Sequence, residues 1–265
     1  MLEKILYGLN IHSRKWIEKK VLKKSDAVIT LSEFTRRKLQ NVYKFNSQKV
    51  YIVPGGVDLD RFQPALDKIE IRRRFNIPQN QVVLLTVRNL VRRMGLENLI
   101  MAVKDVIKTA PDIYLIIAGD GPQKNELIAL AKSLDIEDFI GFTGFIPDKD
   151  LPDYYRAADF FILPTRELEG FGLVTLEAMA SGIPVLGTPV GGTSEILSDF
   201  DPNFLFKDTT VESMTDLILK NYFLIKEKPQ VWQEISQRCR NFIEENYSWE
   251  RNVDGLENFF QVSSH

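Results

Sequence analysis

The sequence predicts an α/β fold, in which a Rossmann-like parallel sheet has helices on both faces and a partial second α/β unit precedes it. From Gln81 onward, short apolar runs alternate with segments of helical spacing such as Leu96, Leu99 and Val103. Such alternation is typical of parallel strands joined by helices. Turn residues also follow the apolar runs, and in a parallel sheet these turns share one edge, where ligands bind.

Six apolar runs are the predicted strands of the larger unit. They are Val82–Val87, Ile113–Ala118, Phe139–Phe142, Phe160–Leu163, Val185–Gly187 and Phe204–Phe206. Turns that contain glycine follow three of them, at 119–122, 144–147 and 165–172. We therefore expect these three turns to converge on one rim of the sheet. The tail from Val211 to Phe260 has largely helical composition.

A shorter unit is expected over residues 1–64, and the larger one over residues 65–265. The predicted elements of the shorter unit are a helix over 2–24, a strand over Ala27–Leu31, a helix that begins at Ser32 and a strand over Val50–Val53. Two strands and one or two helices cannot cover both faces of a parallel sheet. The shorter unit is thus predicted to be part of a larger domain, completed by another polypeptide or a second copy, or to be a truncated or degenerate version of one.

Composition excludes several classes of function. A formal net charge of −2 over 265 residues gives no electrostatic reason to bind nucleic acid. The single Cys239 excludes an intramolecular disulfide and a cysteine-rich metal site, and it suits a reducing compartment such as the cytoplasm. His12 and His265 are the only histidines, which argues against a histidine-based zinc site or a Ser-His-Asp triad. No apolar run reaches about 18 residues, so no span of a bilayer is predicted.

The predicted helix over 2–24 is basic, and two interpretations stay open. It contains Lys15, Lys19 and Lys20 beside Trp16 and Ile17. A helix of this kind can lie on a membrane surface, or it can pack against protein and expose a charged outer face. We therefore expect a cytoplasmic protein, with peripheral contact to the inner face of the membrane under the first interpretation.

The most specific motif follows the predicted strand Phe160–Leu163. It contains two glutamates, Glu169 and Glu177, with seven residues between them, and two glycines, Gly170 and Gly172. The glycines allow the backbone to approach a ligand closely, and the free N–H groups at the start of the next helix favour an anion. The motif can thus bind a phosphate at those amides and sugar hydroxyl groups at the carboxylates on either side. It therefore predicts a nucleotide-sugar site.

The alternative is that both glutamates are solvated surface residues, as most charged residues are. Glu177, however, is set among Leu176, Ala178, Met179 and Ala180. In such an apolar helix, a carboxylate without a partner is costly. This context favours the site.

These residues resemble the signature of family 4 retaining glycosyltransferases with the GT-B fold, and the resemblance extends over nearly the whole chain. The segments that carry it, in the family's order, are Ser25–Ser32, Val53–Asp58 with Phe62, Ala118–Pro122, Phe142–Gly144, Glu169–Gly182 and Pro184–Glu195. The resemblance implies transfer of a sugar from a nucleotide-sugar donor to a glycan, lipid or small-molecule acceptor, with retention of configuration. It also implies two facing domains, of which roughly two-thirds of the amino-terminal one is absent here.

The resemblance also implies roles for individual residues. Glu177 corresponds to the glutamate that binds the ribose, and Glu169 to the glutamate at the transferred sugar, where positive charge grows at the anomeric carbon. Phe145 and Ile146 correspond to the loop that brackets the base, called the base loop. Further residues assigned to donor binding are Gly121, Gly170, Phe171, Gly172 and Leu173. The donor is a UDP- or GDP-sugar, and neither a metal ion nor another cofactor is required.

The stretch after the first strand of the larger unit departs from the family's pattern. Family members show an arginine and a lysine that bind the diphosphate, and alignment on Gly95 puts Asn89 and Met94 at these positions. Arg88 and Arg93 each lie one residue earlier, so we predict that they bind the diphosphate instead. The alternative is that they are surface arginines and the donor site is weakened.

Three functional hypotheses remain from the sequence, the third of which is a structural remnant whose exposed strands pair with a second copy. The first is a catalytic chain or its donor-binding subunit, and the second is a non-catalytic nucleotide-sugar binding module or an inactive truncated homologue. Asp58-Leu-Asp60 and Asp199-Phe-Asp201 could suggest a metal-dependent transferase, but such tripeptides are common and neither follows a strand that begins an α/β unit. We therefore expect no metal site.

Overall fold

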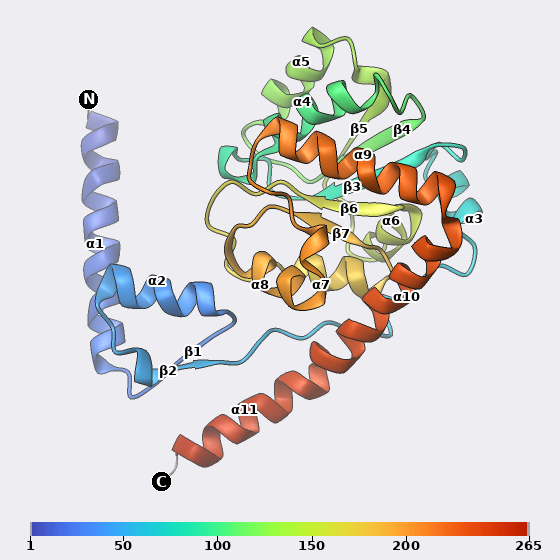
Figure 1. Ribbon diagram of the computed structural model, residues 1–265. Helices are drawn as coiled ribbons and strands as arrows, with labels where there is room; N and C mark the ends of the chain where they lie inside the picture. Colours follow the sequence, from blue (N-terminus) through green and yellow to red (C-terminus); the bar gives the residue numbers. More distant parts are fainter. Residues whose placement is uncertain (1, 264–265) are drawn as a thin grey trace.

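The structure, a computed structural model, describes residues 2–263, with side chains for residues 13–261 (Figure 1). In this part of the chain, a parallel sheet of five strands forms the larger unit, in the order β5-β4-β3-β6-β7. The strands are β3 (Val82–Val87), β4 (Ile113–Ala118), β5 (Ile140–Gly144), β6 (Phe160–Leu163) and β7 (Val185–Gly187). The predicted α/β fold with a parallel sheet is confirmed.

Helices cover both faces of this sheet. The chain runs from β3 through β4 to β5 in one direction and from β6 to β7 in the other, and right-handed crossovers then put the connecting helices on opposite faces. Figure 1 shows α4 and α5 on one side of the sheet and α7 and α8 on the other. The connecting helices are α4 (Leu96–Val106), α5 (Lys124–Ser133), α6 (Leu151–Ala157), α7 (Leu173–Ala180) and α8 (Gly191–Phe200). Short 3₁₀ helices lie at Arg92–Met94, Glu137–Phe139 and Pro202–Phe204.

The core is formed by strands that are buried on both faces. Val83, Leu84 and Leu85 in the middle of β3 are fully buried, although consecutive residues of a strand point to opposite sides. This continuous burial explains why the strands are apolar runs instead of alternating patterns. The helical tail begins with α9 (Val211–Glu227), which packs on α4, and continues with α10 (Pro229–Asn246), which packs on α7 and α9.

The predicted strand Phe204–Phe206 is wrong. Phe204 ends a 3₁₀ helix, and Leu205 makes only an isolated parallel bridge to Gly187 of β7. Phe204 and Phe206 are nonetheless buried in the core. The apolar run therefore reflects burial of two aromatic rings and not strand pairing.

The shorter unit contains two paired strands and two long helices. Its elements are α1 (Leu2–Lys24), β1 (Val28–Thr30), α2 (Glu33–Tyr43), a 3₁₀ helix (Ser47–Lys49) and β2 (Val50–Ile52). Among the described residues, β1 and β2 form a separate parallel pair. The last helix, α11 (Trp249–Ser263), returns to this unit, where the rings of Phe259 and Tyr51 lie 4.8 Å apart. The exact boundary between the units, at residues 64 and 65, stays a prediction.

The helix that was expected to begin at Ser32 is α2, and the Ser32 side chain caps it by accepting a hydrogen bond from the Thr35 amide. Within residues 2–263, no helix has both the length and the apolar content needed to cross a membrane.

Asp159, just before β6, ties the crossover helix α3 (Lys68–Arg74) to the sheet. Its carboxylate accepts from Arg72 at 2.7 Å, from Lys68 at 3.0 Å and from the Val83 amide at 2.7 Å. Burial acts to raise the pKa of Asp159, but the charges of Lys68 and Arg72 outweigh it, so the pKa is held below its usual range. This ion pair fixes the amino ends of β3 and β6 relative to each other.

We expect Asp159→Asn to lower the free energy of unfolding by about 3 kcal/mol at neutral pH, because it leaves Arg72 buried without its counter-charge. Since the folded-state pKa is lowered, the contribution is present above the unfolded pKa of about 3.9 and is lost as the pH falls through the folded pKa. Urea unfolding of both proteins between pH 7 and pH 3 measures this.

The matched control for that experiment is Asp105→Asn, which removes an exposed pair with Lys108. It should change the free energy of unfolding by less than about 1 kcal/mol. A loss for Asp159→Asn that is the same at every pH would contradict the assigned ion pair.

Candidate functional site

The candidate site lies where the direction of the strand order reverses. Strands β3 and β6 are neighbours in the middle of the sheet, with Leu84 opposite Phe160 and Leu85 opposite Phe161. The chain leaves β3 toward β4 and leaves β6 toward β7, so the two turns that follow these strands diverge. Such a switch point opens a crevice at the carboxyl ends of the strands. The turn after β3 begins with Arg88, and the turn after β6 contains Glu169.

Arg88 and Glu169 form an ion pair across this switch point. Their side chains are only 7% and 11% exposed. Nη2 of Arg88 donates to the Glu169 carboxylate and also to the Thr165 hydroxyl, and that hydroxyl lies 3.2 Å from Oε2 of Glu169. Nε of Arg88 is buried and makes no hydrogen bond to any residue that the structure describes. The arrangement brings together Glu169 and Arg88, one of the two arginines predicted to bind the diphosphate.

The turn that carries Glu169 is held by a second glycine turn, at the start of α8. The Gly192 amide donates to the Glu169 carbonyl at 2.9 Å. A Cβ atom on Gly191 would lie 1.9 Å from that carbonyl oxygen, and one on Gly192 would lie 2.5 Å from Cα of Phe171. Gly172, with φ of +94°, is the residue before α7. These close approaches require glycine and fix where the Glu169 side chain starts.

The predicted anion site at the start of α7 has no side-chain cap, and binding of a ligand there stays a prediction. Gly172 has no side chain that could cap the first N–H groups, and Leu173 is half exposed. Gly170 is exposed, but its carbonyl accepts from the Ser32 hydroxyl at 2.5 Å. Phe171 is buried, with its ring 6.2 Å from that of Tyr247. The shorter unit therefore contacts the glycine turn directly.

A cavity of about 440 Å³ adjoins Arg88 at the carboxyl rim of the sheet. Phe145 and Ile146 contribute to its lining, together with Asp148 and Val174 of α7. Phe145 is 78% exposed, whereas Ile146 is buried. Both residues of the predicted base loop thus line the same cavity as Arg88.

Glu177 lies in a neighbouring cavity of about 280 Å³, which Arg61 and Leu173 also line. The Tyr155 hydroxyl donates to its carboxylate at 2.7 Å. Burial raises the pKa of Glu177, and the hydrogen bond from Tyr155 and the charge of Arg61 oppose this only in part. Asp148 of the first cavity and Arg61 of the second form an ion pair at 2.6 Å, so the two cavities meet there.

The two remaining predicted residues take structural positions. Arg93 is exposed, and its Nη1 donates to the Leu168 carbonyl at 3.0 Å, which supports the turn before Glu169. Gly121 packs against the backbone of Leu90, where an added Cβ would lie 2.5 Å from the carbonyl oxygen. Contact of Arg93 or Gly121 with the donor stays a prediction.

Two contributors to the site were missed by the sequence analysis. Thr165 is a polar residue in the first turn after a buried strand, a position that could have marked it. Tyr155 gave no such signal, because it lies in a short helix and looks like any core aromatic residue. Within the described residues, no group of three or more histidine, cysteine, aspartate or glutamate side chains could hold a metal ion.

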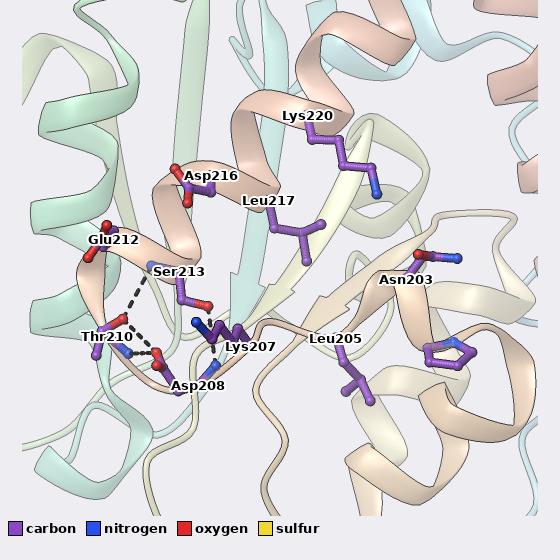
Figure 2. A pocket seen from close by; sticks show the side chains of 11 residues that line it. Asn203, Leu205, Lys207, Asp208, Thr210, Glu212, Ser213, Asp216, Leu217 and Lys220 are labelled. Carbon is purple, nitrogen blue, oxygen red and sulfur yellow. Dashed lines mark hydrogen bonds between the residues drawn. The ribbon is translucent and has the colours of Figure 1, made fainter.

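A further cavity, of about 380 Å³, lies at the start of α9 and has no predicted site residue in its lining (Figure 2). Three of its polar side chains, those of Asp208, Thr210 and Ser213, take part in capping this helix. The Asp208 carboxylate accepts from the Thr210 amide at 2.8 Å, and the Thr210 hydroxyl accepts from the Ser213 amide at 3.2 Å. These contacts give the three side chains a structural role at the start of the helix.

Comparison with known proteins identifies the family. Residues 67–248 match the family described as "Glycosyl transferases group 1", and residues 6–61 match "Glycosyltransferase Family 4". The GDP-mannose-dependent alpha-(1-6)-phosphatidylinositol monomannoside mannosyltransferase of Mycolicibacterium smegmatis is 32% identical over 201 residues, which cover 73% of this chain and 52% of that protein. This chain therefore spans about half the length of that curated relative.

Solved structures agree with this family. Sucrose-phosphate synthase from Thermosynechococcus elongatus superposes with a TM-score of 0.80 at 25% identity, over 96% of this chain and 62% of that one. HepE from Anabaena, in complex with UDP and glucose, superposes with a TM-score of 0.78 at 20% identity. The superposition covers 91% of this chain and 63% of that one. The chain belongs to the glycosyl transferases group 1 family and has the GT-B type of fold, as its resemblance to family 4 retaining glycosyltransferases implied.

Proposed function

We propose that this chain is the donor-binding part of a retaining glycosyltransferase, which moves a sugar from a nucleotide diphosphate to an acceptor. The observation that carries the proposal is the buried pair of Arg88 and Glu169 at the switch point, beside a cavity large enough for part of a nucleotide. One cation for a diphosphate and one carboxylate for a sugar are the groups that such a transfer requires.

In the proposed mechanism, Arg88 binds the diphosphate of the donor and neutralises the charge that develops on it as it leaves. The base enters the cavity lined by Phe145 and Ile146, and Glu177 binds the ribose hydroxyls. Glu169 lies beside the transferred sugar and stabilises the positive charge at the anomeric carbon. The desolvated surroundings of Arg88 and Glu169 strengthen both electrostatic effects.

The donor is a UDP- or GDP-sugar. The mannosyltransferase relative is named for its dependence on GDP-mannose, and the Anabaena structure contains UDP. That same relative acts on a phosphatidylinositol mannoside, which supports a lipid-linked acceptor among the glycan, lipid and small-molecule classes. A cavity of about 670 Å³ between α2 and α8, lined by Phe34 and Gly191 among others, is the proposed acceptor side.

A non-catalytic nucleotide-sugar binding module, or an inactive truncated homologue, is the alternative. Both alternatives predict nucleotide binding, but only the glycosyltransferase would also transfer a sugar.

The shorter unit is proposed to need a protein partner or a second copy. β1 and β2 are each three residues long, and apolar side chains of this unit are exposed, among them Ile29, Leu31, Val42 and Ile52. Additional strands would cover such surfaces and pair with the open edges.

The described part of α1 is proposed to contact the inner, cytoplasmic face of a membrane. Residues 13–24 contain six basic residues and one acidic residue, and Trp16, Ile17 and Val21 are more than half exposed. Anionic lipid attracts such a segment.

The proposed function is tested first by calorimetry with UDP and GDP and then by a transfer assay with both classes of sugar nucleotide. Glu169→Ala should reduce transfer by at least about a hundredfold while nucleotide binding persists.

Arg88→Ala should weaken nucleotide binding by about tenfold or more, because a charged hydrogen-bond donor is lost. Transfer that persists in Glu169→Ala would remove its assigned role, and absence of nucleotide binding would exclude both proposed functions.

Arg93→Ala is the matched comparison for Arg88→Ala, since both variants remove one positive charge near the same turn. If both arginines bind the diphosphate, the two variants weaken binding alike. If Arg93 only supports the turn, its variant binds nucleotide nearly as the parent chain does. Thermal unfolding of each variant checks that it is folded.

Membrane contact is measured by co-sedimentation with phosphatidylglycerol or phosphatidylcholine vesicles. Replacement of Lys19, Lys20 and Lys23 by glutamine should lower binding to the anionic vesicles by more than about tenfold. The control replaces Lys104, Lys108 and Lys132 by glutamine, which removes the same amount of charge outside α1. This control should leave binding to the anionic vesicles unchanged. Equal loss in both triple variants would count against a role for α1.

Light scattering decides between a second copy and a separate chain. A dimer that Ile29→Asp dissociates would support pairing of two copies through the shorter unit. A monomer across the accessible concentration range would exclude the second copy.

A further inference from the structure

Thr165 lies at the point where Arg88 and Glu169 meet, and its hydroxyl takes part in both contacts. Its side chain is almost completely buried, with 1% of the residue exposed. A guanidinium group can only donate hydrogen bonds and a carboxylate can only accept them. The Thr165 hydroxyl therefore accepts from Nη2 of Arg88 and gives its single proton to Oε2 of Glu169.

The backbone of Thr165 is fixed to the neighbouring strand. The Thr188 hydroxyl, just after β7, donates to the Thr165 carbonyl at 2.6 Å, and the Thr188 amide donates to the Leu163 carbonyl at 3.0 Å. Arg88, in contrast, reaches the pair through a long side chain with several rotatable bonds. Of the three groups, the threonine is the one with both a short side chain and a fixed backbone.

We infer that Thr165 is a positioning residue, which keeps Glu169 in place when Arg88 leaves it for the donor diphosphate. In this structure the charge of Arg88 is neutralised by Glu169. An incoming diphosphate must replace the contacts of Arg88 with Glu169 and Thr165, and Glu169 then retains its hydrogen bond from Thr165. The inference rests on the proposed function, because it assumes that Arg88 binds the diphosphate.

This exchange has opposite consequences for binding and for turnover. Without the Thr165 hydroxyl, Arg88 has one contact fewer to give up, so a nucleotide diphosphate binds more tightly. Glu169 at the same time has no fixed partner after the exchange, so transfer is slower. A residue with a merely structural role would weaken binding and turnover together when it is replaced.

The test compares Thr165→Val, which keeps the shape but removes the hydroxyl, with Thr165→Ser, which keeps the hydroxyl. Calorimetry with UDP and GDP should show about fivefold tighter binding for Thr165→Val, as expected for loss of one competing hydrogen bond. Binding of UMP and GMP, which lack the second phosphate, should change less. In the transfer assay kcat should fall about ten- to hundredfold without a rise in the KM of the donor. Thr165→Ser should restore both values.

Thr86→Val is the matched control. Thr86 in β3 is also fully buried, and its hydroxyl bonds to none of the described residues, so its loss should affect neither binding nor turnover. Unchanged or weaker diphosphate binding in Thr165→Val would overturn the inference while the proposed function stands. If the parent chain binds nucleotide without transfer, the binding comparison alone decides. If it binds neither nucleotide, the proposed function fails and the inference with it.

Discussion

The contact between two glycine-containing turns determines the geometry of this site. The turn after β6 would be free to take many conformations if its backbone did not rest on the start of α8. Gly191 and Gly192 allow that approach, because any side chain there would overlap with the backbone of Glu169 or Phe171. The Glu169 carboxylate is consequently directed toward Arg88, which comes from the neighbouring strand. The ion pair thus depends on a contact between the Glu169 backbone and two glycines.

Much of the fold follows from local sequence signals. β3, β4, β6 and β7 have the predicted bounds, because each is a short apolar run closed by glycine, proline or polar residues. The strand expected at Phe204–Phe206 was wrong for a related reason, since burial and strand pairing both select apolar residues. The order of the strands was not predictable from these signals. The strand order depends on non-local packing. It is this order that makes the turns after β3 and β6 neighbours.

The same distinction applies to the site. Glu169, Arg88 and the base loop were selected from the chemistry of single segments and from their resemblance to a family. The contacts between these residues were not predictable in the same way. The sheet brings together residues that are mostly 20 or more positions apart in the sequence, and so creates the contacts of Arg88 with Glu169 and Thr165 and of Tyr155 with Glu177. Arg93 illustrates the limit of such reasoning. An arginine one residue from the family's lysine position has the right charge, but here its guanidinium also binds the Leu168 carbonyl.

The shorter unit contributes to the site even though it supplies none of the predicted catalytic groups. Glu195 of α8 accepts hydrogen bonds from the Glu33 and Phe34 amides at 2.9 and 2.6 Å, where the positive end of the helix dipole of α2 favours a carboxylate. Ser32, at the same helix end, binds the carbonyl of Gly170. The start of α2 is therefore joined to both turns that position Glu169. A movement of the shorter unit must disturb these turns, so the proposed acceptor surface and the Glu169 carboxylate are mechanically coupled through one helix end.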